Sequence, residues 1–428
     1  MTKPSSTNRM VRRLLNWLQC INDLLHLEPI DTIVHGLFWW VTLCLVLPFF
    51  GSFVISAMTL MRLFRMLYRA VYLQQPLEEP IKNPSLSSRE LALVITGCDS
   101  GFGRDLVVEC SASNKYRVFA GCFKQESLSY FEEMENVTAL VVDVTKDEDV
   151  SNLAKIVFDW VSYSTADCDE HDGETKHQES HQQNRPVRYI HALVNNAGSG
   201  TSGLVDWLGM DDYKKDMDVN CFGQIRIVKA FLPFLKRQAS PSCAANKSNK
   251  EESYIDARII NMISVAGIVP LIGCTPYSSS KFAAEAFSNS LRLELRDFNI
   301  QVVTLNPSFH QTPLVENLVD NTWKMWNTLP SSIKEEYGQE YFNNNIVKSL
   351  SVLDISTWRS FNAVNDVFKA IDLRRPRRRY LSGMDSKYVF SVHRLLPDWC
   401  QDLLVPRYSY PPAFFSTQQN FHQKEKDN

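Results

Sequence analysis

One short stretch limits the fold more than any other: an apolar run that leads through a glycine-rich turn into a helix. Residues 91–95 (Leu-Ala-Leu-Val-Ile) have the length and composition of a buried parallel strand. Thr-Gly-Cys-Asp-Ser-Gly-Phe-Gly follows at 96–103, and then apolar residues at helical spacing from Leu106 to Cys110. Glycines allow a tight turn, and the start of the helix offers N–H groups to an anion. The pattern predicts a site for the phosphates of a dinucleotide, with an ordinary strand–helix turn as the alternative.

Apolar strands and helical stretches alternate along the chain that follows. A helix is expected at 148–162, and further strands at 116–122, 138–142, 190–194, 257–263, 300–305 and 380–381. This alternation implies an α/β fold with a doubly wound parallel sheet, Rossmann-like, in a single catalytic domain. In such sheets a ligand lies at the carboxyl ends of the strands. The glycine-rich turn, Asp143, Asn195 and Ser264 fall at those ends. Asp143 is expected either to contact an adenine edge or to cap the next helix.

Two polar segments, 163–187 and 239–254, interrupt the pattern and are expected to be disordered surface insertions. The first carries three histidines, at 171, 177 and 181. They lack partner cysteines at metal-ligand spacing, so we interpret them as part of a solvated loop and expect no metal site.

The N-terminal part has a different composition. From Thr32 to Met61 there is no Asp, Glu, Lys or Arg, and this run exceeds the roughly 20 residues that span a bilayer as a helix. It is expected to cross the membrane once or to return as a hairpin, with a buried core helix as the alternative. The leucine-rich stretch 11–27 fits an interfacial helix. Arginines after the run favour a cytosolic catalytic domain. The expected organisation is an anchor at 1–71, a linker at 72–88, the catalytic domain at 89–390 and a C-terminal extension at 391–428.

Composition excludes some partners. Hydrophobic residues make up 44% of the 428 and the formal net charge is −3, so no global electrostatic attraction to nucleic acid is expected. The ten cysteines are scattered without paired spacing, which indicates a reducing compartment and no disulfide framework.

The stretch Tyr277-Ser-Ser-Ser-Lys281 carries a chemical signal. On a helix, the tyrosine and the lysine share one face. An ammonium beside a phenol lowers the phenol pKa, so that the tyrosine can exchange a proton with an alcohol near neutral pH. Taken alone, the pair could equally be part of a solvated helix face.

Together, these motifs resemble the short-chain dehydrogenase/reductase family. The resemblance rests on Thr96-Gly97-(x)3-Gly101-x-Gly103, on Asn195-Asn196-Ala197-Gly198, on Asn220, and on Ser264 followed by Tyr277-(x)3-Lys281. It covers about residues 90–385 with the motifs in order. Four segments are most similar to the branch of the family that contains retinol, hydroxysteroid and 3-hydroxybutyrate dehydrogenases: TGCDSGFG, VFAGCF, NMISVAG and YLSGMDSKY.

The resemblance implies a role for each matching residue. Ser264 would hold the substrate oxygen, Tyr277 would transfer the proton, Lys281 would tune the tyrosine and hold the nicotinamide ribose, and Asn220 would place a water that links Lys281 to solvent. The implied cofactor-binding residues are Thr96, Gly97, Ser100, Gly101, Phe102, Gly103, Asp143, Asn195, Ala197, Gly198, Tyr277, Lys281 and Pro307.

Three departures from the family pattern concern specificity. The residues after strand two are Cys122, Phe123 and Lys124, without the acid that NAD-preferring enzymes often carry there. The branch resemblance implies NAD, with NADP as the alternative. Ser308 stands where the family usually has glycine. The long segment 309–360 carries four large aromatics, Trp323, Trp326, Phe342 and Trp358, which suit either an apolar substrate or core packing.

The predicted function is hydride transfer between NAD(P) and a lipophilic secondary or allylic alcohol or carbonyl, steroid- or retinoid-like. The alternatives are a 3-hydroxybutyrate-type hydroxy-acid dehydrogenase and a catalytically silent, membrane-tethered cofactor-binding scaffold. Expected partners are a lipophilic small molecule and the membrane, with a homodimer as an option and no nucleic acid. The expected location is the endoplasmic reticulum membrane, with the mitochondrial membrane or a lipid droplet as alternatives.

Overall fold

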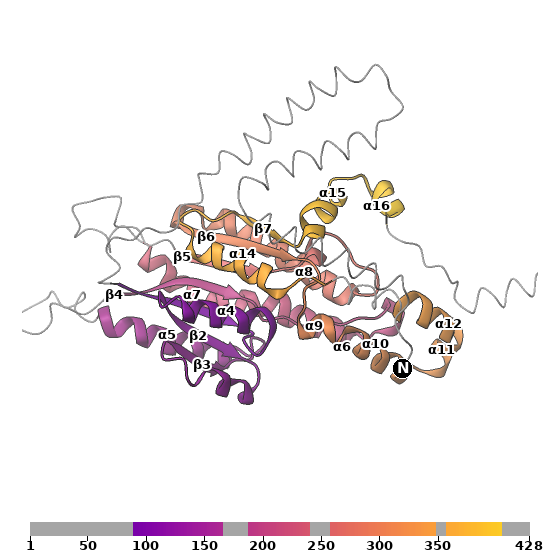
Figure 1. Ribbon diagram of the computed structural model, residues 1–428, viewed down its shortest axis with the longest axis horizontal. Coiled ribbons are helices and arrows are strands. Elements are labelled where there is room, and N and C mark those ends of the chain that lie inside the picture. The colour runs from indigo at the N-terminus through magenta and orange to yellow at the C-terminus, as the bar shows by residue number, and fades with distance from the viewer. Residues whose placement is uncertain (1–88, 166–186, 240–256, 348–356, 405–428) are drawn as a thin grey trace, which may run out of the picture. The chain divides into compact units, whose positions relative to one another are not determined.

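The computed structural model describes residues 89–165, 187–239, 257–347 and 357–404 (Figure 1). In this part of the chain one seven-stranded sheet has the order β3-β2-β1-β4-β5-β6-β7, and every neighbouring pair is parallel. The strands are β1 (Arg89–Thr96), β2 (Tyr116–Cys122), β3 (Val137–Val141), β4 (Val187–Asn195), β5 (Ala257–Met262), β6 (Ile300–Pro307) and β7 (Arg379–Ser382). The order reverses between β1 and β4, which is the switch point where such sheets bind ligands.

The predicted sheet is confirmed, with small differences at its edges. Strand β3 lies one residue earlier than expected, and β1, β4, β6 and β7 are longer, because pairing with neighbours extends the ladder beyond the apolar run. The first predicted insertion was too long: α5 (Asp147–Thr165) continues through its first three residues, and β4 begins at its last. The remainder of that insertion, and the second one from residue 240, lie outside the described residues.

Two helical layers cover the sheet. Apolar residues of α4 (Gly101–Ala112) and α14 (Ser360–Asp372) pack on one face, for example Leu106 and Val367. The other face is covered by α5, α7 (Gly223–Gln238) and α8 (Thr275–Glu294), with Leu153 and Phe231 in its core. Figure 1 shows α4 and α14 on the same side of the strands. The alternation of Leu93 into one core and Val94 into the other follows from the two-residue repeat of a strand.

Further helices connect and extend these layers. Between β2 and β6 they are η3 (Gln125–Phe131), η4 (Val205–Trp207), α6 (Met210–Met217), η5 (Asp218–Phe222), η7 (Val265–Gly267) and η8 (Arg296–Phe298). After β6 they are α9 (Pro313–Glu316), α10 (Leu318–Thr328), α11 (Ser331–Tyr337), α12 (Gln339–Tyr341), η9 (Phe342–Val347), η10 (Ser386–Phe390), α15 (Ser391–His393) and α16 (Asp398–Leu404).

The aromatic segment after β6 packs mainly on itself. Trp326 stacks on Phe342 at 4.3 Å between ring centroids, and Trp207 of η4 contacts both rings. Trp323 meets Phe342 edge-on at 4.7 Å. These rings form a small core beside the sheet, so core packing accounts for most of the aromatic content noted in the sequence.

No helix among the described residues is both long enough and apolar enough to cross a membrane. The predicted anchor at 1–71 and the linker at 72–88 lie outside the described residues. The described residues other than 373–377 belong to one compact unit.

Candidate active site

The turn between β1 and α4 requires glycine at three positions. Gly97 and Gly101 have φ angles of +70° and +57°, a region that side chains disfavour. At Gly103 a Cβ atom would lie 2.3 Å from the Gly97 carbonyl oxygen and 2.5 Å from Nδ2 of Asn196. Because no side chain fits there, the start of α4 packs directly against the turn.

The start of α4 fits a phosphate group. Its first turn contains no acidic residue, and the side chain of Ser100, the residue before the helix, makes no capping hydrogen bond. Helix N-terminal N–H groups without a side-chain acceptor are suited to an anion. The residues present therefore fit the diphosphate of a dinucleotide cofactor. The Phe102 side chain packs edge-on against the His310 ring, with 5.4 Å between the ring centroids.

The motif after β4 holds the glycine-rich turn in place. Asn196 Nδ2 donates to the carbonyl oxygens of Thr96 (3.0 Å) and Gly97 (2.9 Å). The Thr96 hydroxyl accepts from the N–H groups of Asn196 and Ala197. The side chain of Asn195 instead donates to Oδ1 of Asn261 at 2.8 Å within the sheet. Asn196, which the sequence analysis did not select, is therefore the amide that clamps the cofactor turn.

The predicted catalytic residues come together at the carboxyl ends of β4 and β5. Ser264 follows β5, and its side chain hydrogen-bonds Tyr277 of α8. Lys281, one turn further along α8, is buried and donates to the Met262 carbonyl oxygen at 3.0 Å. Its Nζ lies 5.7 Å from the centre of the Tyr277 ring. The helical spacing read from the sequence thus places both side chains at one site.

Asn220 is fully buried in η5, a π-helical segment between α6 and α7. Its amide nitrogen donates to the Ser199 carbonyl oxygen (2.9 Å) and to Ser280 Oγ (2.8 Å), and its oxygen accepts from the Ser199 N–H. Ser280 Oγ in turn donates to the Tyr277 carbonyl oxygen. Asn220 therefore ties the segment after β4 to the helix that carries Tyr277 and Lys281.

A buried acid beside this group was missed by the sequence analysis. Asp216 of α6 is fully buried, and its carboxylate accepts from Ser199 Oγ (2.7 Å) and from the Thr201 N–H (2.9 Å). Its negative charge raises the pKa of both Tyr277 and Lys281. In the sequence Asp216 is one of several charged residues in a short stretch, and nothing in that stretch indicates that it is buried.

Burial controls the titration of the pair. It raises the pKa of Tyr277 to about 12, although the hydrogen bond with Ser264 acts in the opposite direction. Burial also lowers the pKa of Lys281 to about 8. The expectation that the ammonium would bring the phenol toward neutral pH is not met in this structure, because desolvation of the phenolate dominates.

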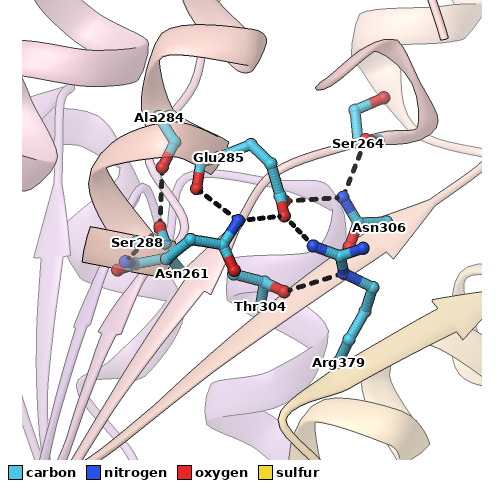
Figure 2. A network of polar contacts seen from close by, with 9 residues as sticks. Asn261, Ser264, Ala284, Glu285, Ser288, Thr304, Asn306 and Arg379 are labelled. Atoms are coloured by element: carbon cyan, nitrogen blue, oxygen red, sulfur yellow. Dashed lines mark hydrogen bonds and ion pairs between the residues drawn. The ribbon is translucent and has the colours of Figure 1, made fainter. Parts of the chain in front are cut away.

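A network of hydrogen bonds and one ion pair holds the backbone at Ser264 (Figure 2). The Asn306 amide donates to the Ser264 carbonyl oxygen (3.1 Å) and to the carboxylate of Glu285 (3.2 Å). Glu285 lies one turn after Lys281 on α8, is buried, and pairs with Arg379 of β7. Arg379 also donates to Thr304 Oγ1. The loop that positions Ser264 is therefore bonded to α8, β6 and β7.

Two other predicted residues are placed at the strand ends. The Asp143 carboxylate accepts from the N–H and the hydroxyl of Thr145, in the turn that precedes α5. Pro307 is the last residue of β6 and is paired with Ser382 of β7.

Residues 160–323 match the sequence profile of the short chain dehydrogenase family. Human short-chain dehydrogenase/reductase family 9C member 7 is 32% identical over 329 residues, which are 76% of this chain and 91% of the human protein. The chain belongs to the short-chain dehydrogenase/reductase family. As a member of it, the protein is an oxidoreductase that uses a nicotinamide cofactor, NAD or NADP.

Other members of this family cover the chain similarly. Mouse retinol dehydrogenase 16 is 31% identical, over 73% of this chain and 86% of its own length. Bovine 17-beta-hydroxysteroid dehydrogenase type 6 is 29% identical, over 74% and 89%. The crystal structure of a short-chain dehydrogenase/reductase from Burkholderia phymatum in complex with NAD has a TM-score of 0.52 at 19% identity, covering 76% of this chain and 98% of that one. This last likeness shows the shared fold.

Proposed function

We propose that the protein oxidises a lipophilic secondary or allylic alcohol, or reduces the matching carbonyl, with a steroid- or retinoid-like substrate. One observation supports the apolar character of the substrate. A Cβ atom added to Gly200 would lie 3.2 Å from Leu314 Cδ1 and 3.4 Å from Cδ2 of the Tyr277 ring. The side chains of Leu314 and Tyr277 therefore flank the same space. Leu314 is 43% exposed, so an apolar side chain lines part of the space beside Tyr277.

The proposal assigns one task to each residue of the site. Ser264 holds the substrate oxygen, and Tyr277 gives a proton to the carbonyl or takes one from the alcohol. Lys281 tunes Tyr277 and holds the cofactor ribose, and Asn220 positions the water that links Lys281 to solvent. A bound nicotinamide supplies or accepts the hydride. The buried position of Lys281 and Asn220 supports these tasks, because a site that excludes bulk water keeps the transferred proton under the control of the protein.

The cofactor site in this proposal is formed by the predicted residues at the strand ends. Thr96, Gly97, Ser100, Gly101, Gly103, Ala197 and Gly198 would provide backbone groups and close approach. Lys281 and Pro307 would lie on the nicotinamide side. Asn195, Phe102 and Asp143 also make the side-chain contacts described above, and Asn195 Oδ1 and the Asp143 carboxylate keep acceptor capacity beyond them.

The names of the relatives agree with a lipophilic substrate, since they include a retinol and a hydroxysteroid dehydrogenase. The uncharged run 32–61 supports membrane attachment, and the arginines after it support a cytosolic catalytic domain; the membrane that we propose is that of the endoplasmic reticulum. We therefore propose the organisation anchor 1–71, linker 72–88, catalytic domain 89–390 and extension 391–428. An apolar substrate would then reach the enzyme from the bilayer.

The test uses the purified full-length chain in detergent with NAD or NADP and a panel of sterols, retinols and 3-hydroxybutyrate, following reduced nicotinamide. Turnover of a sterol or a retinol supports the proposal. Turnover of 3-hydroxybutyrate alone would replace it with a hydroxy-acid dehydrogenase. Tight cofactor binding without any turnover would favour a silent scaffold.

A further inference from the structure

An acidic side chain from another segment of the chain lies at the carboxyl end of β2. The residues after this strand, Phe123 and Lys124, offer no carboxylate of their own. Asp99, from the glycine-rich turn after β1, reaches across to them. Its Oδ2 accepts from the Phe123 N–H at 2.8 Å, and its Oδ1 accepts from the Lys124 N–H at 2.8 Å and from Ser127 Oγ at 2.9 Å. A negative charge is therefore fixed at the end of β2.

The backbone on both sides of Asp99 keeps it in this position. The N–H of Cys98 donates to the Gly121 carbonyl oxygen at 2.9 Å, which continues the pairing of β1 with β2 into the turn. Gly97 and Gly101, both with positive φ, redirect the chain before and after it. The position of the carboxylate is thus set by the same turn that would hold the diphosphate.

The carboxylate keeps capacity for one more donor. An ionised carboxylate has about four acceptor sites on its two oxygens, and the protein fills two on Oδ1 and one on Oδ2. Asp99 is partly exposed, so the remaining site is accessible. In dinucleotide-binding sheets the end of β2 is where an acid accepts a hydrogen bond from the ribose 2′-hydroxyl of NAD. A 2′-phosphate at that place would be repelled by the fixed charge.

We propose that Asp99 sets a preference for NAD over NADP by supplying, from the glycine-rich turn, the carboxylate that β2 itself lacks. This rests on the nicotinamide site proposed above. Two cations lie on the neighbouring elements: Lys124, which is exposed, and Arg104, whose guanidinium stands 5.0 Å from the Tyr130 ring centre. Asp99 accepts hydrogen bonds from the backbone N–H groups directly after β2. Its charge is therefore held at the end of β2 more firmly than the charges of Lys124 and Arg104.

The test measures equilibrium binding without substrate. Dissociation constants of NADH and NADPH are obtained by nicotinamide fluorescence and calorimetry for the full-length protein and for Asp99→Asn, which removes the charge at nearly constant shape. The wild type is expected to bind NADH more tightly. The ratio of the NADPH to the NADH dissociation constant should fall at least about tenfold in Asp99→Asn.

Ser127→Ala is the matched control, because it removes one hydrogen bond to the same carboxylate and leaves the charge. Its ratio should equal that of the wild type. Equal weakening of both nucleotides in Asp99→Asn would mean that Asp99 only holds the turn, and would overturn the proposal, as would a wild type that prefers NADPH. If circular dichroism shows Asp99→Asn to be unfolded, Asp99→Ser replaces it with a hydroxyl acceptor and the same criterion. Absence of turnover with the substrate panel leaves these binding results unchanged.

Discussion

The Ser308 hydroxyl donates a 2.6 Å hydrogen bond to the carboxylate of Asp385, which lies 77 residues further along the chain. The same Asp385 oxygen accepts from Trp358 Nε1 at 2.7 Å. At Gly383, a Cβ atom would lie 2.3 Å from Ser308 Oγ, so glycine is required where the two segments meet. The serine that replaces the glycine usual in the family is therefore bonded to the segment after β7, which fixes the exit of β6.

Asp385→Asn should change how stability depends on pH. Burial raises the pKa of Asp385 above its usual 3.8, so the folded protein holds this proton more tightly than the unfolded chain does. The contribution of Asp385 to stability is then largest below pH 3.8 and falls as the pH rises through the raised pKa. Urea unfolding from pH 3.5 to 7 should show Asp385→Asn gaining stability relative to the wild type over this range. A constant difference between the two would contradict the shift. Asp398→Asn controls for loss of an exposed carboxylate.

Tyr277→Phe should lower kcat by about 10²–10⁴-fold, since the ring stays and the proton donor is lost. Cofactor affinity, measured by nicotinamide fluorescence, should stay within about twofold, because the phenol hydroxyl adds little to the binding of the whole dinucleotide. The neighbouring exposed Ser279→Ala serves as the control and should keep wild-type activity. A Tyr277→Phe enzyme that retains most of its turnover would refute the role of the phenol.

Asp216→Asn should move the pH profile of alcohol oxidation to lower pH. The Asp216 charge raises the pKa of both Tyr277 and Lys281, so its removal lowers both. The profile of kcat/KM reports ionisations of the free enzyme, and its rising limb should shift by about one pH unit. A shift to higher pH, or none in a folded variant, would show that the charge of Asp216 does not reach the pair.

Glu285→Ala should destabilise the protein strongly. The carboxylate accepts from Arg379, Asn306 and Asn289 in a buried position, and its loss removes an ion-pair partner of Arg379. Asn306 then has an unsatisfied buried N–H and Arg379, which is 26% exposed, loses a partner; we expect a cost of about 1–3 kcal/mol of unfolding free energy. Glu294→Ala, at an exposed site on the same helix, should stay within about 0.5 kcal/mol of the wild type. Equal effects of the two changes in urea unfolding would show that the network in Figure 2 carries no net stability.

Gly103→Ala should weaken NADH binding at least about tenfold, since the added methyl group displaces the turn that faces the phosphates. The new atom would lie 2.3 Å from the Gly97 carbonyl oxygen, a backbone atom that cannot move alone. Gly209→Ala is the comparison, because its Cβ would meet a single atom at 3.9 Å. Unchanged NADH affinity in Gly103→Ala would argue against a phosphate site at the start of α4.

Much of the fold could be predicted from local patterns. The apolar runs identified all seven strands to within a few residues, because burial on both faces requires nearly continuous apolar sequence. The spacing from Tyr277 to Lys281 placed both side chains on one helix face, since that relation depends only on the helical repeat. The predicted anchor, by contrast, lies outside the described residues.

The residues that determine the electrostatics of the site were not predictable in this way. Asp99, Asp216, Glu285 and Asp385 are acids whose partners come from elsewhere in the chain, and no local pattern indicates which strand end or helix will meet them. The sequence by itself determined the strands, the glycine turn and the tyrosine–lysine pair, because these depend on neighbours within a few residues. Only the tertiary structure decided which carboxylate stands beside β2, Tyr277 or Ser308, because charges act through space and burial decides their strength.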